Sequence, residues 1–119
     1  MPHSCNIPLY KYLYIEMSKK SITENYNGLA ETLKSVAHPE RIAILNLICN
    51  CREKRMTVKS IYESLELEQP IVSRHLGILK RCGMLERENE GVSTFYAQCR
   101  NNKMAERIYK CLCNYTTLK

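Results

Sequence analysis

The segment from Leu67 to Arg87, LEQPIVSRHLGILKRCGMLER, constrains the fold of this chain more than any other segment. Its apolar residues recur at the spacing of an α-helix, which we expect over residues 69–82. At about 100° per residue, Val72, Leu76 and Leu79 share one side of this helix. The opposite side, an arc of about 140°, carries Gln69, Ser73, Arg74, Gly77, Lys80 and Arg81. We call these residues the polar face. The pattern predicts a helix with one buried side and one exposed, cationic side.

Gly77 is the member of the polar face that least suits a helix. Glycine costs about 1 kcal/mol relative to alanine in a helix interior. Its bare backbone, however, lets a partner approach closely. We therefore interpret the polar face as a binding surface. An ordinary solvated helix face is the alternative.

Apolar periodicity and turn residues predict further elements around this helix. They are helices over 21–37, 40–51, 58–65 and 102–115 and a β-hairpin over 84–99 whose turn is expected at residues 89–91. The apolar side of the last helix is predicted to carry Met104, Ile108, Cys111, Leu112 and Tyr115. Ser21 and Glu24 form a capping box that opens the first helix. Pro39 is placed to start the second helix, and Thr57 to cap the third. The second helix is apolar on most sides, so we expect it in the centre of the domain.

The expected fold is mainly α with a small β-hairpin, in the order α-α-α-α-β-β-α. A short helix, a tight turn and a helix with a polar, cationic front form a helix-turn-helix, and the hairpin that follows is its wing. In this arrangement the polar face reaches base edges in the major groove, and Arg and Lys side chains meet phosphates. The net charge of +6 also favours an anionic partner such as nucleic acid.

The predicted wing is more acidic than this role suggests. Glu86, Glu88 and Glu90 occupy its first strand, where Arg87 is the only cation before the turn. Carboxylates repel phosphate, so we expect the wing to contribute little affinity, with Arg87 as its candidate DNA contact.

The stretches HPERIAILNLI, TVKSIYESLELEQPIVSRHLGILKRCGML and GVSTFYAQC resemble the ArsR/SmtB family of bacterial winged-helix repressors. The resemblance covers about residues 26–115, and VSRHLGILKRCGML is its most specific part. It implies a homodimer, formed largely by the first and last helices, that occupies a palindromic operator in double-stranded DNA. It also implies release of the operator when an inducer binds.

Position by position, the family's recognition-helix residues fall on Gln69, Ser73, Arg74 and His75. His75 lies nearer the apolar side of the helix, so a packing role and a contact at the edge of the groove are both open. Two positions depart from the family pattern. Glu66 stands where Gly is usual, and Glu68 stands where a capping Ser or Thr is usual.

Seven cysteines are an odd count without a regular disulfide framework. Two Cys-x-Cys pairs lie on the second and last predicted helices: Cys49 with Cys51, and Cys111 with Cys113. The resemblance implies one role for them, because some family members sense oxidants or sulfide with one cysteine in each of these helices. Packing of free thiols in the core is a second role. A thiophilic metal ion, bound tetrahedrally if it is zinc, is a third.

The family's two familiar metal sites lack their ligands in this chain. When this chain is aligned with the family through SIYESL, the Cys-x-Cys pair that binds metal on the third helix falls on Thr57 and Lys59. The other site uses His and carboxylates on the last helix, and the last helix of this chain contains no His. We therefore assign no cofactor from the sequence. A thiophilic metal ion remains the alternative.

The remaining expectations concern organisation and class. Residues 1–20 are predicted to be an N-terminal arm or extra helix, with Met17 as an alternative start, and residues 21–119 form the DNA-binding domain with dimerisation helices at both ends. We find neither a run of roughly 20 apolar residues nor a signal peptide, so we expect a cytoplasmic protein. We find no Gly-rich phosphate loop, no Ser-His-Asp set and no paired carboxylates, so we expect no enzyme. A winged helix that binds protein or RNA and has structural cysteines is the alternative function.

Overall fold

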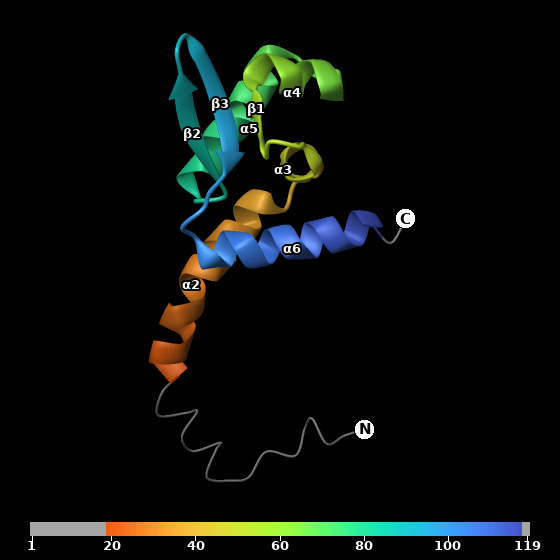
Figure 1. The fold of residues 1–119 in the computed structure, drawn as a ribbon. Helices are drawn as coiled ribbons and strands as arrows, with labels where there is room; N and C mark the ends of the chain where they lie inside the picture. Colours follow the sequence, from red (N-terminus) through yellow and green to blue (C-terminus); the bar gives the residue numbers. More distant parts are fainter. Residues whose placement is uncertain (1–18, 118–119) are drawn as a thin grey trace. The chain divides into compact units, whose positions relative to one another are not determined.

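The computed structural model describes residues 19–117. The chain divides into two compact units, residues 1–30 and residues 31–119, and each is described by itself. The elements of the described part (Figure 1) are α2 (Lys19–Val36), α3 (Pro39–Asn50), β1 (Arg55–Thr57), α4 (Val58–Leu65), α5 (Gln69–Arg81), β2 (Leu85–Glu90), β3 (Ser93–Gln98) and α6 (Lys103–Thr117). Within this part, no helix combines the length and the apolar character that crossing a membrane requires.

Helix α2 contributes Lys19–Ala30 to the first unit and its last turns to the second. The predicted capping box is wrong, because Lys19 and Lys20 are already helical and Ser21 lies inside the helix. Lysine is a good helix former, which permits this earlier start. Residues 1–18, on which most of the predicted N-terminal arm falls, lie outside the described residues.

Helix α3 is the central helix of the second unit, as its apolar sequence predicted. Ile44, Leu45 and Ile48 are fully buried. Pro39 occupies the first turn, and the Nδ1 atom of His38 accepts a hydrogen bond of 3.1 Å from the backbone N–H of Glu40. This bond satisfies one of the backbone donors that a helix N-terminus leaves open. Helix α3 contacts α4, α5 and α6 as well as strands β1 and β3.

The predicted β-hairpin is confirmed, but it belongs to a three-stranded antiparallel sheet in the order β1-β3-β2. Strand β1 was not predicted. It has three residues, of which Met56 pairs with Tyr96 and Thr57 pairs with Phe95 of β3. A strand this short shows no alternating pattern of its own, and only pairing with a distant strand defines it.

The hairpin turn lies beyond the predicted one. Asn89 and Glu90, expected in the turn, pair with Thr94 and Ser93 across the ladder. Gly91 and Val92 connect the two strands, and Gly91 has a φ of +63°. A two-residue hairpin loop favours such left-handed backbone, which glycine adopts without steric cost.

Helices α4 and α5 form the predicted helix-turn-helix (Figure 1). The Thr57 side chain caps α4 by accepting a hydrogen bond of 3.1 Å from the N–H of Ser60. Glu66 then adopts a left-handed conformation, with φ 56° and ψ 43°, which explains why glycine suits this position. Glu68 precedes α5 and makes no side-chain capping bond, as its departure from Ser or Thr predicted. Gly83, with a φ of +88°, ends α5.

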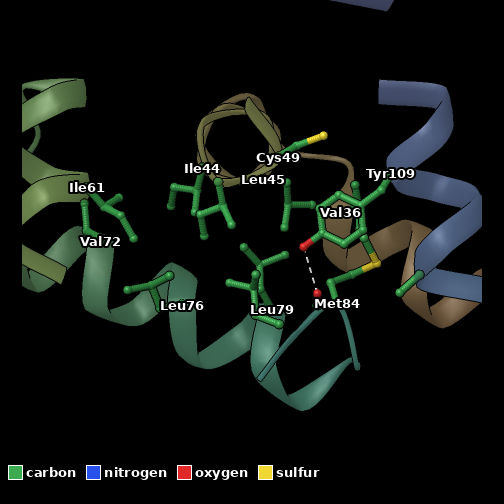
Figure 2. Close-up of a cluster of buried hydrophobic side chains, with 13 residues drawn as sticks. Val36, Ile44, Leu45, Cys49, Ile61, Val72, Leu76, Leu79, Met84 and Tyr109 are labelled. Carbon is green, nitrogen blue, oxygen red and sulfur yellow. Dashed lines mark hydrogen bonds between the residues drawn. The ribbon is translucent and has the colours of Figure 1, made fainter. Parts of the chain in front are cut away.

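The core of the second unit lies between α3, α4, α5 and α6 (Figure 2). Its fully buried side chains include Ile44, Leu45, Ile48, Ile61, Val72, Leu76, Leu79 and Met84. Tyr109 of α6 enters this cluster, and its hydroxyl donates a hydrogen bond of 2.8 Å to the carbonyl oxygen of Met84. Burial raises the pKa of Tyr109, so the hydroxyl keeps its proton and remains a donor.

The buried face of α6 is rotated from the predicted one. Ala105 and Tyr109 are buried, whereas Cys111 and Tyr115, predicted on the apolar side, are exposed. The sequence pattern misled because Tyr109, rather than Ile108, supplies the largest buried side chain, with its polar atom satisfied by Met84.

Candidate nucleic-acid interface and the cysteine pair

The two sides of α5 are separated as its periodicity predicted. Val72, Leu76 and Leu79 have no exposed surface. The polar face lies opposite, with Gln69, Ser73, Arg74, Lys80 and Arg81 exposed and Gly77 half-buried. A row of small and cationic side chains is therefore available on one side of an α-helix, which is an element that enters a major groove.

Gly77 has no structural requirement within its own helix. A β-carbon built there meets only the Nη1 atom of Arg81, at 3.6 Å, which is an ordinary contact. Its φ is not in the left-handed region, so alanine suits its backbone conformation. The fold itself therefore does not explain why a helix of this length keeps glycine at its centre.

His75 is the member of the predicted recognition set that does not lie on the surface. Only 4 % of the surface of His75 is exposed. The Nη1 atom of Arg41 lies 3.3 Å from its Nδ1 atom, and Oε1 of Glu40 lies 2.8 Å from its Nε2 atom. An Arg guanidinium only donates, so Nδ1 accepts and Nε2 carries the proton donated to Glu40. The imidazole thus fastens the middle of α5 to the first turn of α3.

The structure also brings His38 next to this pair, which the sequence did not predict. The rings of His38 and His75 lie 4.8 Å apart. The ligand atoms of His38, Glu40 and His75 all lie within 4.8 Å of one another, so the group has the composition of a cation site. Both nitrogens of His75 already have hydrogen-bond partners, and we interpret the group as a polar network that joins two helices. Only the fold brings these residues together, since His38 and His75 are distant in the sequence.

The acidic wing has a counter-charge that the sequence analysis missed. Arg55 of β1 places Nη1 at 3.3 Å from Oε1 of Glu88 and Nη2 at 3.2 Å from Oε1 of Glu90. Its guanidinium also lies over the Phe95 ring, 4.0 Å from the centroid. Arg100 adds a longer pair with Glu88, at 3.8 Å. Two of the wing's carboxylates are therefore partly neutralised before DNA approaches, and Arg87 stays exposed.

Two of the four candidate sensing cysteines form a disulfide. Cys49 of α3 and Cys113 of α6 are joined, across a sequence separation of 64 residues. The bond links the end of the central helix to the last helix. In this state the two sulfur atoms are not thiolates, so they cannot serve as ligands of a four-cysteine metal site.

The other candidate thiols lie apart from this bond. The Cys51 thiol donates to the carbonyl oxygen of Arg55 at 3.4 Å, and Cys111 is exposed. The Cys82 thiol donates to the carbonyl oxygen of Leu79 at 3.4 Å. Cys99 remains a free thiol. Cys5 lies outside the described residues.

Helix-turn-helix, wing and exposed polar face together define the class of this protein: it is a winged helix-turn-helix DNA-binding protein. The family model for bacterial regulatory proteins of the arsR family matches residues 38–87. The transcriptional repressor PagR of Bacillus anthracis is 37% identical over 83 residues, which cover 70% of this chain and 79% of PagR. The chain belongs to the ArsR family.

Two further comparisons agree with this assignment. The biofilm growth-associated repressor of Agrobacterium fabrum is 29% identical over 109 residues, covering 89% of this chain and 91% of that protein. The crystal structure of PagR superposes with a TM-score of 0.65 at 33% identity, covering 76% of this chain and 98% of that chain. The resemblance inferred from the sequence is confirmed, and the chain is a DNA-binding transcriptional regulator of a family that includes repressors.

Proposed function

We propose that this regulator is a repressor that binds a palindromic operator as a homodimer and reads it with the polar face of α5. The observation that carries the proposal is the separation of α5 into a fully buried apolar side and an exposed cationic side. Ser73 and Arg74 lie in the middle of α5, where they can reach base edges. Lys80 and Arg81 lie at the C-terminal end of the helix, where phosphates are the expected partners. A protein-binding surface would be more apolar than this.

The wing and His75 take supporting roles in this proposal. Arg87 contacts the DNA backbone, and Arg55 reduces the repulsion between phosphates and Glu88 and Glu90. His75 does not touch bases, because its ring is buried and bonded to α3. It holds α5 at the angle from which the polar face enters the groove.

Apolar side chains on the surface support the dimer. Leu33 of α2 is 46 % exposed, Ile42 of α3 is 37 % exposed and Tyr115 of α6 is 66 % exposed. Large apolar side chains of this kind are costly in water and suit an interface between subunits. The predicted dimerisation helices, the first and the last, each contribute one of them.

Selection of bound duplexes from a random pool tests the DNA proposal. We expect a palindromic consensus and an affinity that falls steeply with salt, because phosphate contacts release counterions. Arg74→Ala with Arg81→Ala should weaken binding about tenfold or more. Arg52→Ala with Lys103→Ala removes the same charge from exposed positions outside the polar face and is the matched control. Full affinity of the Arg74 and Arg81 double variant would overturn the assignment of the polar face.

We further propose that oxidation of Cys49 and Cys113 to a disulfide releases the operator. The bond couples α3, which packs on α5, to α6, which we assign to the dimer interface. It thereby changes how two polar faces are spaced across the dimer. Reduction restores the binding-competent arrangement.

Operator binding under reductant and after tetrathionate treatment tests this redox proposal. The oxidised protein should bind at least about tenfold more weakly, which corresponds to about 1.4 kcal/mol. Cys113→Ser should bind equally well in both states. Cys111→Ser, which removes an exposed neighbouring thiol, should respond like the unchanged protein. Equal affinity of the oxidised and reduced forms would leave the disulfide with a structural role only.

A further inference from the structure

A cavity of about 420 Å³ opens against the disulfide between Cys49 and Cys113. Three segments of the second unit build it: the end of α3 with the turn that follows, the end of β3 with the two residues after it, and one side of α6. On α6, Glu106, Lys110 and Cys113 follow one another at the spacing of a single helix side. The cavity is large enough for a small molecule, and both sulfur atoms belong to residues of its wall.

The charges around this cavity are unequal. Lys54, Arg100 and Lys110 line it with positive charge, against the single carboxylate of Glu106. Lys54 is held in place by a hydrogen bond from its Nζ atom to the carbonyl oxygen of Cys49. The Arg100 side chain is 77% exposed and pairs only at 3.8 Å with Glu88, so its guanidinium remains able to bind a guest. A cleft lined by one sign of charge concentrates molecules of the other sign.

The two cysteines of the disulfide differ in exposure. Cys49 is 4 % exposed, whereas Cys113 is half-buried. A nucleophile entering from the cavity therefore meets Cys113 first. The departing sulfur is then that of Cys49, the residue whose carbonyl oxygen accepts the hydrogen bond from the Lys54 ammonium. A cation in the same cavity wall favours a thiolate over a thiol.

We infer that this cavity is a docking site for small anionic thiols, which reduce the disulfide by exchange. The inference rests on the redox function proposed above and names the class of molecule that reverses it. A guest thiolate attacks Sγ of Cys113, a sulfur–sulfur bond forms between them, and the Cys49–Cys113 bond breaks with Cys49 leaving as a thiolate. A second guest thiolate attacks the guest sulfur of this mixed disulfide and releases Cys113. Two guest thiols become one guest disulfide, and their protons pass to the two cysteines.

Reduction rates with thiols of different charge test the inference. The probes are mercaptosuccinate, which is anionic, 2-mercaptoethanol, which is neutral, and cysteamine, which is cationic. Appearance of protein thiols is followed by alkylation and mass spectrometry, and each rate is divided by the thiolate concentration, with allowance for thiol basicity. We expect mercaptosuccinate to be faster than cysteamine by about tenfold or more at low salt, with the difference shrinking as salt is added.

Charge variants separate the cavity from the basic character of the whole protein. Arg100→Gln with Lys110→Gln should remove most of the preference for mercaptosuccinate. Lys59→Gln with Lys103→Gln lowers the net charge equally at exposed positions outside the cavity and should preserve it. Glu106→Gln, which removes the only carboxylate of the lining, should enlarge the preference. The Glu106 variant tests the same idea in the opposite direction if the double variant folds poorly.

The outcomes distinguish this inference from the proposed redox function. Equal normalised rates for the three thiols, or a preference that survives Arg100→Gln with Lys110→Gln, would overturn the docking site. A disulfide that still controlled operator binding in that case would leave the redox function intact. Charge-selective reduction without any change in operator affinity would support the docking site and contradict the redox function. Failure of the two cysteines to form a disulfide in oxidant would overturn both.

Discussion

Single residues on α5 divide between the buried core and the face that we propose to bind DNA. Within one helix, Val72, Leu76 and Leu79 are completely buried, while Arg74, two residues after Val72, is exposed. Their positions follow from helix periodicity alone, and the sequence was sufficient to predict them. At Gly77, helix stability and the proposed close approach of DNA make opposite demands on the residue.

Gly77→Ala should stabilise the fold and weaken DNA binding. Alanine gains about 0.5–1 kcal/mol of helix stability over glycine, and its β-carbon meets only Arg81 Nη1, at 3.6 Å. A methyl group on the polar face nevertheless prevents the closest approach of a duplex. We expect a higher midpoint in urea unfolding and a roughly tenfold loss of operator affinity, equivalent to about 1.4 kcal/mol.

Gly28→Ala is the matched control for this prediction. Gly28 is also a helical glycine, and a β-carbon there meets nothing within 4 Å. It should raise helix stability by a similar amount without reducing operator affinity, provided that the oligomeric state is unchanged. A Gly77→Ala protein that is more stable and binds DNA as well as before would show that close approach at Gly77 is not required.

Tyr109 is a residue whose protonation state contributes to stability. Burial raises its pKa above the ordinary value of 10, so the folded protein holds this proton more tightly than the unfolded chain. Its contribution is therefore complete below about pH 10 and decreases as the pH rises above that value. Tyr109→Phe should cost about 1–2 kcal/mol at pH 7, because the carbonyl of Met84 loses its donor.

The pH dependence distinguishes this effect from simple loss of packing. The free energy of unfolding in urea is measured at pH 7 and again above pH 10. The decrease between the two pH values should be smaller for Tyr109→Phe than for the unchanged protein. Equal losses in the two proteins would mean that Tyr109 releases its proton as easily in the folded state as in the unfolded state.

At the scale of elements, the wing depends on a strand outside it. Strand β1 supplies Arg55, which pairs with Glu88 and Glu90 of β2 from the far side of β3. The sequence analysis treated the wing as a hairpin alone and so attributed to it an uncompensated negative charge. The interaction is absent from the local pattern because 33 residues separate Arg55 from Glu88.

Arg55→Ala should weaken operator binding by a factor of about 3 to 10. Loss of the guanidinium removes the pair with Glu90 and leaves Glu88 with only its longer pair to Arg100, so phosphates meet more negative charge on the wing. Stability should change little, because ion pairs that solvent can reach contribute little to folding. Arg52→Ala, which removes an exposed charge three residues earlier, is the control. Equal affinities of the two variants, measured by fluorescence anisotropy at low salt, would contradict a specific role for Arg55.

At the scale of the whole molecule, features that depend on local sequence patterns could be predicted, whereas contacts between distant segments could not. Helices α3, α4 and α5 and the hairpin followed from periodicity and turn residues. The disulfide between Cys49 and Cys113 joins positions 64 residues apart, and the Glu40–His75 bond spans 35 residues. The spacing of the cysteines suggested candidates for the disulfide, but nothing in the sequence indicated the Glu40–His75 bond. Both contacts depend on how the helices pack.

Reduction of the disulfide should lower the stability of the domain. Closing a loop of this length restricts the unfolded chain by up to about 4 kcal/mol in the loop-entropy model, given the separation of 64 residues. Thermal unfolding with and without reductant should therefore show a lower midpoint for the reduced protein. Cys113→Ser should unfold at one temperature in both conditions. Identical midpoints for the oxidised and reduced forms of the unchanged protein would contradict this expectation.

Helix α3 touches both His75 of α5 and the disulfide, the two features that the redox proposal connects. Its first turn carries Glu40 and Arg41, which hold His75, and its last turn carries Cys49. A helix of 12 residues is roughly 18 Å long, and this one is packed along its length. In the redox proposal, a tilt of this helix caused at Cys49 also changes the angle of its first turn, which holds His75 of α5, so the proposal requires no separate relay between the disulfide and the polar face.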